Sequence, residues 1–151
     1  MPTVSDLLSL TYTTQVIEEA MRLYPPAWVF ERQALSDDVI AGCTVKKGTV
    51  VGIAPYVMHR NPEFFAEPEV FRPERFEKQL SAKRPKHAYI PFGGGPRMCI
   101  GNAFAMMEMQ VILPMVLRAA TVSSLPDFKL ELEPSVTLRP KDGMPMKLAL
   151  V

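Results

Sequence analysis

The sequence predicts a mixed fold that is mainly helical and carries small antiparallel β elements. Residues 13–23 and 101–118 have helical patterns, the first with one apolar stripe and the second apolar almost all round. Residues 28–53 are rich in valine and isoleucine and are interrupted by glycine, which is typical of short strands joined by turns. Proline contributes 15 of the 151 residues, so we also expect a long ordered loop.

Composition and charge narrow the class of protein. Apolar residues make up 48% and charged residues 22% of the chain, which is ordinary for a soluble globular domain. The net charge of +1 gives no reason to expect nucleic acid as a partner. No apolar run reaches the roughly 18 residues that cross a bilayer, so we predict no membrane segment. Two cysteines, Cys43 and Cys99, and no secretory signal predict a reducing, cytoplasmic location.

The first part of the chain should hold one helix followed by short strands. The amphipathic pattern of residues 13–23 ends at Pro25 and Pro26, because proline disfavours helix in the residue before it. In the strand region that follows, Gly42 and Gly48 mark tight turns between antiparallel strands.

The rest of the chain divides into a proline-rich loop, a helix and further strands. Residues 55–98 contain too many prolines for a long helix, so we expect an ordered loop with short helical pieces near residues 56–59 and 63–65. The helix of residues 101–118 should be buried, because it is apolar almost all round. Alternating polar and apolar residues predict strands at 128–132 and 146–148.

A carboxylate and an arginine stand out in the first helix. Glu19 shares a helix face with Val16 and Ala20, so its carboxylate lies in the apolar stripe, where an unpaired charge would be costly. Arg22 follows three residues later and is within reach for an ion pair. Because Glu-x-x-Arg recurs by chance in many helices, an ordinary surface pair is the alternative interpretation.

A second arginine could reach the same carboxylate. Prolines fix the path of the segment Phe-Arg-Pro-Glu-Arg-Phe at residues 71–76, and Arg75 within it could supply a second cation to Glu19. The alternative is an aromatic-proline turn whose charges are solvated.

The strongest pattern surrounds Cys99. Residues 92–101 read Phe-Gly-Gly-Gly-Pro-Arg-Met-Cys-Ile-Gly and lead directly into the apolar helix. Three consecutive glycines permit positive φ angles and the close approach of a flat or bulky group. A cysteine at a helix N-terminus meets free amide groups and the positive end of the helix dipole, which favours the thiolate that binds metal. Arg97 adds a cation suited to a carboxylate of the ligand.

A single thiolate limits the kind of metal site. Without partner cysteines or histidines, Cys99 cannot close a zinc site. It can serve as the axial ligand of heme iron, where a thiolate favours O–O bond cleavage. A cysteine hydrolase that pairs Cys99 with His59 or His87 is another hypothesis, although no orienting group stands at a recognisable spacing.

Together, the three motifs resemble the cytochrome P-450 family. The family's cysteine loop follows the pattern F-x-x-G-x-R-x-C-x-G, which is matched at Phe92, Gly95, Arg97, Cys99 and Gly101. The Glu-x-x-Arg pair and the proline-flanked arginine are similar to two other family hallmarks, in the same chain order. The resemblance covers residues 1–151. It implies the C-terminal portion of a single P-450 domain: ExxR helix, short strands, proline-rich meander, cysteine loop, buried helix and C-terminal strands.

The resemblance implies a role for each matched residue of the cofactor site. Cys99 would be the proximal ligand of the iron in heme b. Phe92 would pack beside its sulfur, while Gly95 and Gly101 would belong to the same cofactor-binding loop. Arg97 would bind one heme propionate, and Arg32 falls where the family places a second propionate-binding arginine.

The resemblance also implies that Glu19, Arg22 and Arg75 form a salt-bridged triad that locks the helix to the long loop. The other conspicuous residues have ordinary interpretations. His59 and His87 are expected to be loop histidines, because they lack metal-ligand spacing. A basic run before the cysteine loop could dock an acidic electron donor or be a solvated charge run; its members are Lys83, Arg84 and Lys86.

As an enzyme of this family, the protein would be a monooxygenase that inserts one oxygen atom of O2 into an apolar small-molecule substrate. Its electrons would come from a redox partner of the ferredoxin, flavodoxin or reductase type. In the family, a portion N-terminal to the ExxR helix supplies the distal helix over the heme, and we expect that portion to be absent here. A truncated, catalytically incompetent heme-binding fragment is therefore the alternative.

Overall fold

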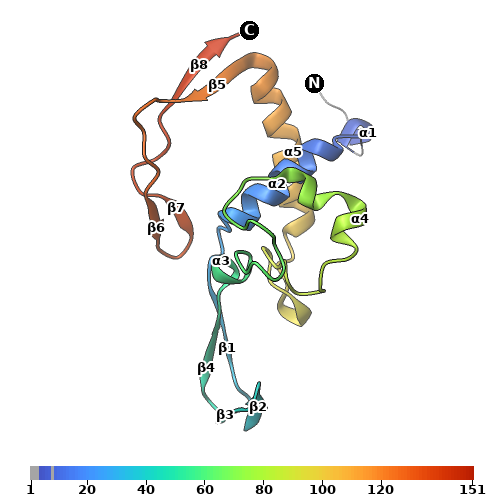
Figure 1. Cartoon of the computed structure of the whole chain (residues 1–151), viewed down its shortest axis with the longest axis vertical. Coiled ribbons are helices and arrows are strands. Elements are labelled where there is room, and N and C mark those ends of the chain that lie inside the picture. The colour runs from blue at the N-terminus through green and yellow to red at the C-terminus, as the bar shows by residue number, and fades with distance from the viewer. Residues whose placement is uncertain (1–3, 8) are drawn as a thin grey trace.

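Two long helices cross at the centre of the molecule, and thin β-hairpins extend from them (Figure 1). The computed structural model describes residues 4–7 and 9–151. Its helices are α1 (Val4–Leu7), α2 (Thr11–Leu23), α3 (Pro55–Met58), α4 (Lys78–Ser81) and α5 (Asn102–Ala119), with 3-10 helices η1 (Pro73–Phe76) and η2 (Gly95–Arg97). Its strands are β1 (Phe30–Gln33), β2 (Asp38–Ile40), β3 (Cys43–Val45), β4 (Val50–Ile53), β5 (Ala120–Ser124), β6 (Leu132–Pro134), β7 (Leu138–Pro140) and β8 (Met146–Leu150). The predicted mixed fold with small antiparallel sheets is confirmed.

Both predicted long helices are present, but their surroundings differ. α2 contains the predicted residues 13–23, and its Ile17 and Leu23 are buried. α5 matches the predicted residues 101–118 to within one residue, yet none of its residues is buried. The prediction that this helix is buried is wrong for the described chain: α2 packs against one side of it, while apolar side chains such as Phe104 (65% exposed) face solvent. Among the described residues, every helix is too short or too polar to span a lipid bilayer.

The strands predicted between residues 28 and 53 form two antiparallel hairpins. β1 pairs with β4 so that Phe30 lies opposite Ile53, and β2 pairs with β3. The turn between β2 and β3 has positive φ at Ala41 (48°) and Gly42 (83°). Two residues with positive φ match the twist of a tight hairpin, so the predicted turn at Gly42 is confirmed.

The C-terminal strands also form two hairpins, β5 with β8 and β6 with β7. The strand predicted at residues 146–148 is confirmed as part of β8. The strand predicted at 128–132 is wrong except for its last residue, where β6 begins. Alternation marks one polar and one apolar face, but a strand also needs a ladder partner, and β7 supplies one only from Leu132 onward.

The proline-rich region of residues 55–98 is an ordered loop interrupted by α3, η1, α4 and η2. The helical piece predicted near residues 56–59 is confirmed as α3. The piece predicted at 63–65 is a single hydrogen-bonded turn instead, in which the amides of Phe64 and Phe65 donate to the Asn61 carbonyl.

The apolar core lies between α2 and this loop. Contacts between α2 and η1 hold the two together. The buried apolar side chains of this region are Ile17, Met21, Leu23, Phe65, Phe76, Ala88 and Ile90. A small core on one side of α2 leaves the polar contacts described below to fix the path of the loop.

The exposed apolar side of α5 generates a first prediction: the purified chain should self-associate. Replacing the exposed Phe104 and Ile112 by glutamine should lower the associated fraction, measured by size exclusion with light scattering. Val39→Gln makes the same kind of change at an exposed site on β2 and serves as the control. Unchanged association in the α5 double variant would contradict the prediction.

Candidate functional site

A buried ion cluster joins α2 to the loop. Glu19 and Arg22 are 0% exposed and Arg75 is 8% exposed. Arg22 donates from Nε to Glu19 Oε2 at 2.7 Å and from Nη2 to Oε1 at 2.8 Å, a two-point fork that fixes the carboxylate. Arg75 donates from Nε to Glu19 Oε1 at 3.2 Å. The structure thus brings together the three residues predicted as a triad.

Backbone groups of the loop complete this cluster. The Arg72 amide donates to Glu19 Oε1 at 2.8 Å. Arg22 and Arg75 both donate to the Val70 carbonyl, at 3.3 Å and 3.2 Å. The remaining positive charge is therefore compensated by backbone dipoles, and α2 is fastened to a segment about fifty residues away in the chain.

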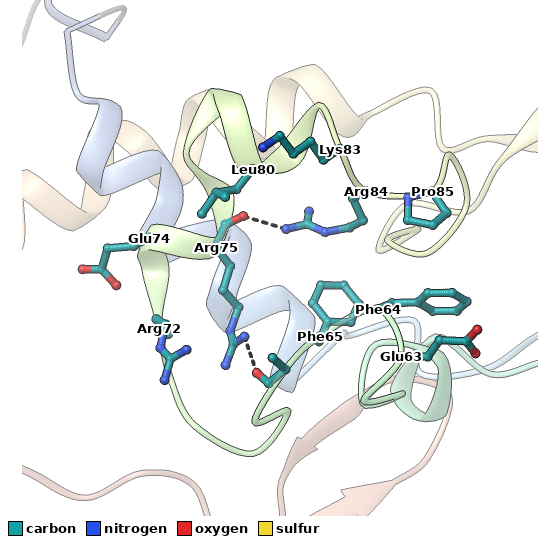
Figure 2. Close-up of a pocket in the computed structure, with 11 residues that line it drawn as sticks. Glu63, Phe64, Phe65, Arg72, Glu74, Arg75, Leu80, Lys83, Arg84 and Pro85 are labelled. Atoms are coloured by element: carbon teal, nitrogen blue, oxygen red, sulfur yellow. Dashed lines mark hydrogen bonds between the residues drawn. The ribbon is translucent and has the colours of Figure 1, made fainter.

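Figure 2 shows the side of the cluster that borders a cavity of about 350 Å³. Arg75 points to the Ala66 carbonyl, and its own carbonyl accepts a hydrogen bond from Arg84 Nη2 at 2.7 Å. The Arg84 guanidinium lies 4.9 Å from the Phe65 ring centroid and 4.5 Å from that of Phe76, within the range of cation–π attraction. Arg84 is therefore packed against the core and is not part of a solvated charge run.

The cysteine loop is closed by its own backbone. The Cys99 amide donates to the Phe92 carbonyl at 2.9 Å, and the Met98 amide donates to the Gly95 carbonyl at 3.1 Å. Gly93 (φ 74°) and Gly95 (φ 70°) adopt left-handed backbone conformations that other residues rarely take. The turn itself therefore requires glycine at these two positions.

The other end of the loop leads into α5 with its sulfur accessible. Cys99 and Ile100 are exposed. A Cβ added to Gly101 would lie 3.8 Å from Cys99 Sγ, which is an ordinary contact. The fold of the chain therefore does not require glycine at Gly101.

Cys99 lies on the wall of a cavity of about 460 Å³. Phe92 and Arg97 from the cysteine loop line the same cavity, as does Arg32 from β1. Further apolar lining residues include Met21, Phe30, Ala105 and Met109. The structure therefore groups the candidate iron ligand with both arginines predicted to bind propionates, whereas Gly95 and Gly101 lie outside the lining.

Neither Arg32 nor Arg97 forms an ion pair with any residue that the structure describes. Arg32 donates from Nη1 to the Glu31 carbonyl at 2.8 Å, and its guanidinium lies 5.0 Å from the Phe30 ring centroid. Two guanidinium groups on a mainly apolar cavity suit a large apolar ligand that carries carboxylates.

Sequence reasoning missed the helix residues on the cavity wall. Nothing in the sequence marks Met21 as a cavity residue. Ala105 and Met109 could have been found, because they are four residues apart on the helix that follows Cys99 and so share one face.

The two histidines and the second cysteine lie elsewhere. His59, His87 and Cys43 do not line the cavity of Cys99. His59 is fully buried, and its Nε2 accepts a hydrogen bond from the Ile90 amide. Within the described residues the structure therefore does not form the cysteine–histidine pair that a hydrolase would use.

The sequence matches the family model of cytochrome P450 over residues 1–147. The chain belongs to the cytochrome P450 family. Among curated P450 relatives, it is 39% identical over 143 residues to putative cytochrome P450 132 of Mycobacterium tuberculosis (strain ATCC 25618 / H37Rv), covering 95% of this chain and 31% of the relative. It is 44% identical over 147 residues to human cytochrome P450 4V2, covering 97% of this chain and 28% of the relative. The chain thus spans under a third of the length of these P450 proteins.

Solved P450 structures have the same fold over the whole chain. The crystal structure of the cytochrome P450DA heme domain matches with a TM-score of 0.94 and 28% identity, covering 100% of this chain and 33% of that one. The retinoic acid-bound cyanobacterial CYP120A1 matches with a TM-score of 0.93 and 34% identity, covering 100% of this chain and 35% of that one. The resemblance drawn from the three motifs is confirmed at the level of family and fold.

The ion cluster generates a second prediction. Glu19→Ala leaves two buried arginines without their carboxylate and should lower the free energy of unfolding by about 3–5 kcal/mol. The control is Glu131→Ala, because Glu131 pairs with Lys141 at 2.8 Å on the exposed surface and its loss should cost at most about 1 kcal/mol. Urea titration followed by circular dichroism measures both. Equal losses in the free energy of unfolding for the two variants would contradict the prediction that burial makes the Glu19 ion pairs more important than a surface pair.

Proposed function

We propose that the protein is a heme-thiolate monooxygenase and that residues 1–151 form the C-terminal, heme-anchoring part of its P450 domain. The observation that carries this proposal is the grouping of Cys99, Arg97 and Arg32 on one cavity, in a chain of the P450 family. A cysteine sulfur and two guanidinium groups without ion pairs among the described residues match the iron and the two carboxylates of heme b.

The residues on the cavity fit this cofactor. Cys99 offers an exposed sulfur as the single axial ligand. Arg97 and Arg32 have no competing ion pair among the described residues, so each can take a propionate. A Cβ added at Gly93 or Gly95 would meet open space, so this stretch of the loop leaves room beside the cavity. Gly101 is assigned to the cofactor on the family pattern alone.

When bound, the heme would supply oxygen activation driven by electrons from a redox partner, so that one oxygen atom enters an apolar substrate. The chain's own contribution is to hold and orient. The Phe92 carbonyl accepts the Cys99 amide and so fixes the end of the loop at the sulfur. The mainly apolar walls, including Met21 and Met109, would contact the apolar ring of the cofactor.

The redox partner is proposed to be a ferredoxin, a flavodoxin or a reductase. Lys83 and Lys86 are exposed just before the cysteine loop, and an acidic partner would be attracted to them. Arg84 contributes less to such an encounter, because its guanidinium is stacked on buried aromatic rings. A reducing cytoplasm fits the two unpaired cysteines.

A second candidate function is heme binding without monooxygenase activity. The exposure of Cys99, Ile100 and Phe104 favours it, because a site open to water cannot keep dioxygen chemistry coupled to the substrate. The two candidates share the cofactor and the ligand and differ only in turnover.

The ligand assignment is tested by absorption spectroscopy of the reduced carbon monoxide complex. Cys99→Ser should abolish the strongly red-shifted band of thiolate-ligated heme, because serine offers no thiolate. Cys43→Ser, the same change at the exposed cysteine of β3, should leave the band intact. Survival of the band in Cys99→Ser would refute the proposed site.

Turnover by residues 1–151 alone tests whether their cavity is sufficient for the reaction. We expect residues 1–151 alone, supplied with heme, a reductase system and a panel of apolar substrates, to form little product per electron consumed. The physical reason is the solvent-exposed sulfur and helix described above. Tightly coupled product formation by this chain would show that its cavity is sufficient for the full reaction.

A further inference from the structure

His59 is a buried polar residue that neither the ion cluster nor the cofactor cavity uses through its side chain. It follows α3 and is 0% exposed. Its ring centroid lies 5.0 Å from that of Tyr89 and 6.4 Å from that of Phe65. A buried imidazole nitrogen without a hydrogen-bond partner lowers the stability of the fold. The hydrogen bonds of His59 therefore indicate its structural role.

His59 contacts two distant parts of the chain through two different atoms. Its backbone carbonyl accepts a hydrogen bond from Arg22 Nη1 at 2.9 Å. Its side-chain Nε2 accepts one from the Ile90 amide, also at 2.9 Å. One residue therefore bridges the ion cluster and the segment that enters the cysteine loop.

The path continues from Ile90 to the sulfur through backbone hydrogen bonds. The Ile90 carbonyl accepts the Gly93 amide at 3.0 Å. The Phe92 carbonyl, two residues after Ile90, accepts the Cys99 amide at 2.9 Å. A displacement of Ile90 would therefore be passed to both ends of the loop that holds Cys99.

The acceptor role fixes the state of the imidazole ring. A nitrogen that accepts a hydrogen bond carries no proton, so the neutral His59 ring holds its proton on Nδ1. Nδ1 is buried and has no partner among the described residues. The fold thus leaves one ring nitrogen unsatisfied while keeping the Nε2 contact to Ile90.

We propose that His59 is a positioning residue that couples the ion cluster of Glu19, Arg22 and Arg75 to the cysteine loop by accepting the Ile90 amide with a neutral ring. The inference rests on the proposed function only for the role of Cys99 as the iron ligand. The coupling itself is a property of the protein chain.

The charges around His59 agree with a neutral ring. Burial lowers the pKa of His59 to about 4, and the cations of Arg22, Arg60 and Arg84 act in the same direction, while the backbone of Arg22 beside the ring opposes them. The stacked Tyr89 phenol stays neutral, because burial raises its pKa. Protonation of Nε2 would place two N–H groups against each other and break the contact.

The competing explanation is that His59 only fills space between the Tyr89 and Phe65 rings. Two amide substitutions separate the explanations. In His59→Gln, the side-chain oxygen reaches about as far as Nε2 and can accept the Ile90 amide. In His59→Asn, the oxygen reaches only about as far as Nδ1 and leaves that amide unpaired. Both variants remove the ring.

The measurement is hydrogen exchange of the Ile90 amide by NMR, on the full protein as purified. His59→Asn should exchange at least about tenfold faster than the wild type at Ile90, because a buried amide has lost its acceptor, and His59→Gln should stay close to the wild type. His87→Asn, the same change at an exposed loop histidine, is the control and should leave Ile90 unchanged. Equal loss in the Gln and Asn variants, including failure of both to fold, would overturn the proposal.

The link to the sulfur has its own measurement in the heme-loaded protein. The fraction of reduced carbon monoxide complex that shows the thiolate band should fall in His59→Asn and be restored in His59→Gln. Absence of the band in every protein, wild type included, would instead count against Cys99 as the ligand. The hydrogen exchange of the Ile90 amide would still decide whether His59 couples the ion cluster to the cysteine loop. An intact band in His59→Asn with fast Ile90 exchange would overturn the link to the sulfur.

The neutral ring predicts a pH dependence. The folded pKa of His59 lies below the usual value, so the unfolded chain binds the proton first and stability falls as pH drops from about 6.5 towards about 4. The wild-type unfolding equilibrium constant should rise over this range on the order of a hundredfold more than that of His59→Gln. Parallel pH profiles of the two proteins would overturn the neutral-acceptor role.

Discussion

The Glu19 carboxylate has no access to solvent, and its charge must be compensated by groups that the chain brings from far away. Taking a carboxylate out of water costs several kcal/mol, which is recovered only when its partners are in good geometry. Arg22 comes from the same helix, but Arg75 and the Arg72 amide lie 53–56 residues further on. The proline-rich loop therefore has one path that satisfies the carboxylate, and the order of that loop follows from this requirement more than from its small apolar core.

This constraint reaches the cofactor cavity through α2. Met21 and Arg22 are neighbours in sequence and point in directions about 100° apart around the helix. Arg22 enters the ion cluster, while Met21 lines the cavity that holds Cys99. One helix therefore sets the position of the cluster and of one cavity wall together. The loop supplies the second connection, because the His59 side chain accepts the Ile90 amide shortly before the cysteine loop.

Motifs with short, rigid spacing could be predicted from the sequence, since geometry within one turn or one helix decides them. The Glu19–Arg22 pair, the hairpin turn at Gly42 and the loop before Cys99 are of this kind. Features that depend on contact with a distant segment of the chain could not be predicted from the sequence. The burial of α5 and the strand at residues 128–132 were wrong because the pattern was present and the partner was not. His59 was an ordinary loop residue by sequence, and only the fold brings its ring to Ile90.

Almost every buried polar group of the described chain has a partner, whereas many apolar side chains are exposed. In the described chain, His59 Nδ1 is the one buried side-chain nitrogen or oxygen without a partner, so the ion cluster needs nothing from outside. The apolar surfaces of α5 and Ile100 remain exposed. An unpaired buried charge costs several kcal/mol at a single point, whereas exposed apolar surface costs about 25 cal/mol per Å². The charges of the cluster must therefore find their partners within the chain as it folds. The apolar surface of α5 can stay exposed until the cofactor or a packing partner covers it. A loop already held by the cluster would present Cys99 and Arg97 in place, which lowers the entropy cost of binding a large rigid ligand.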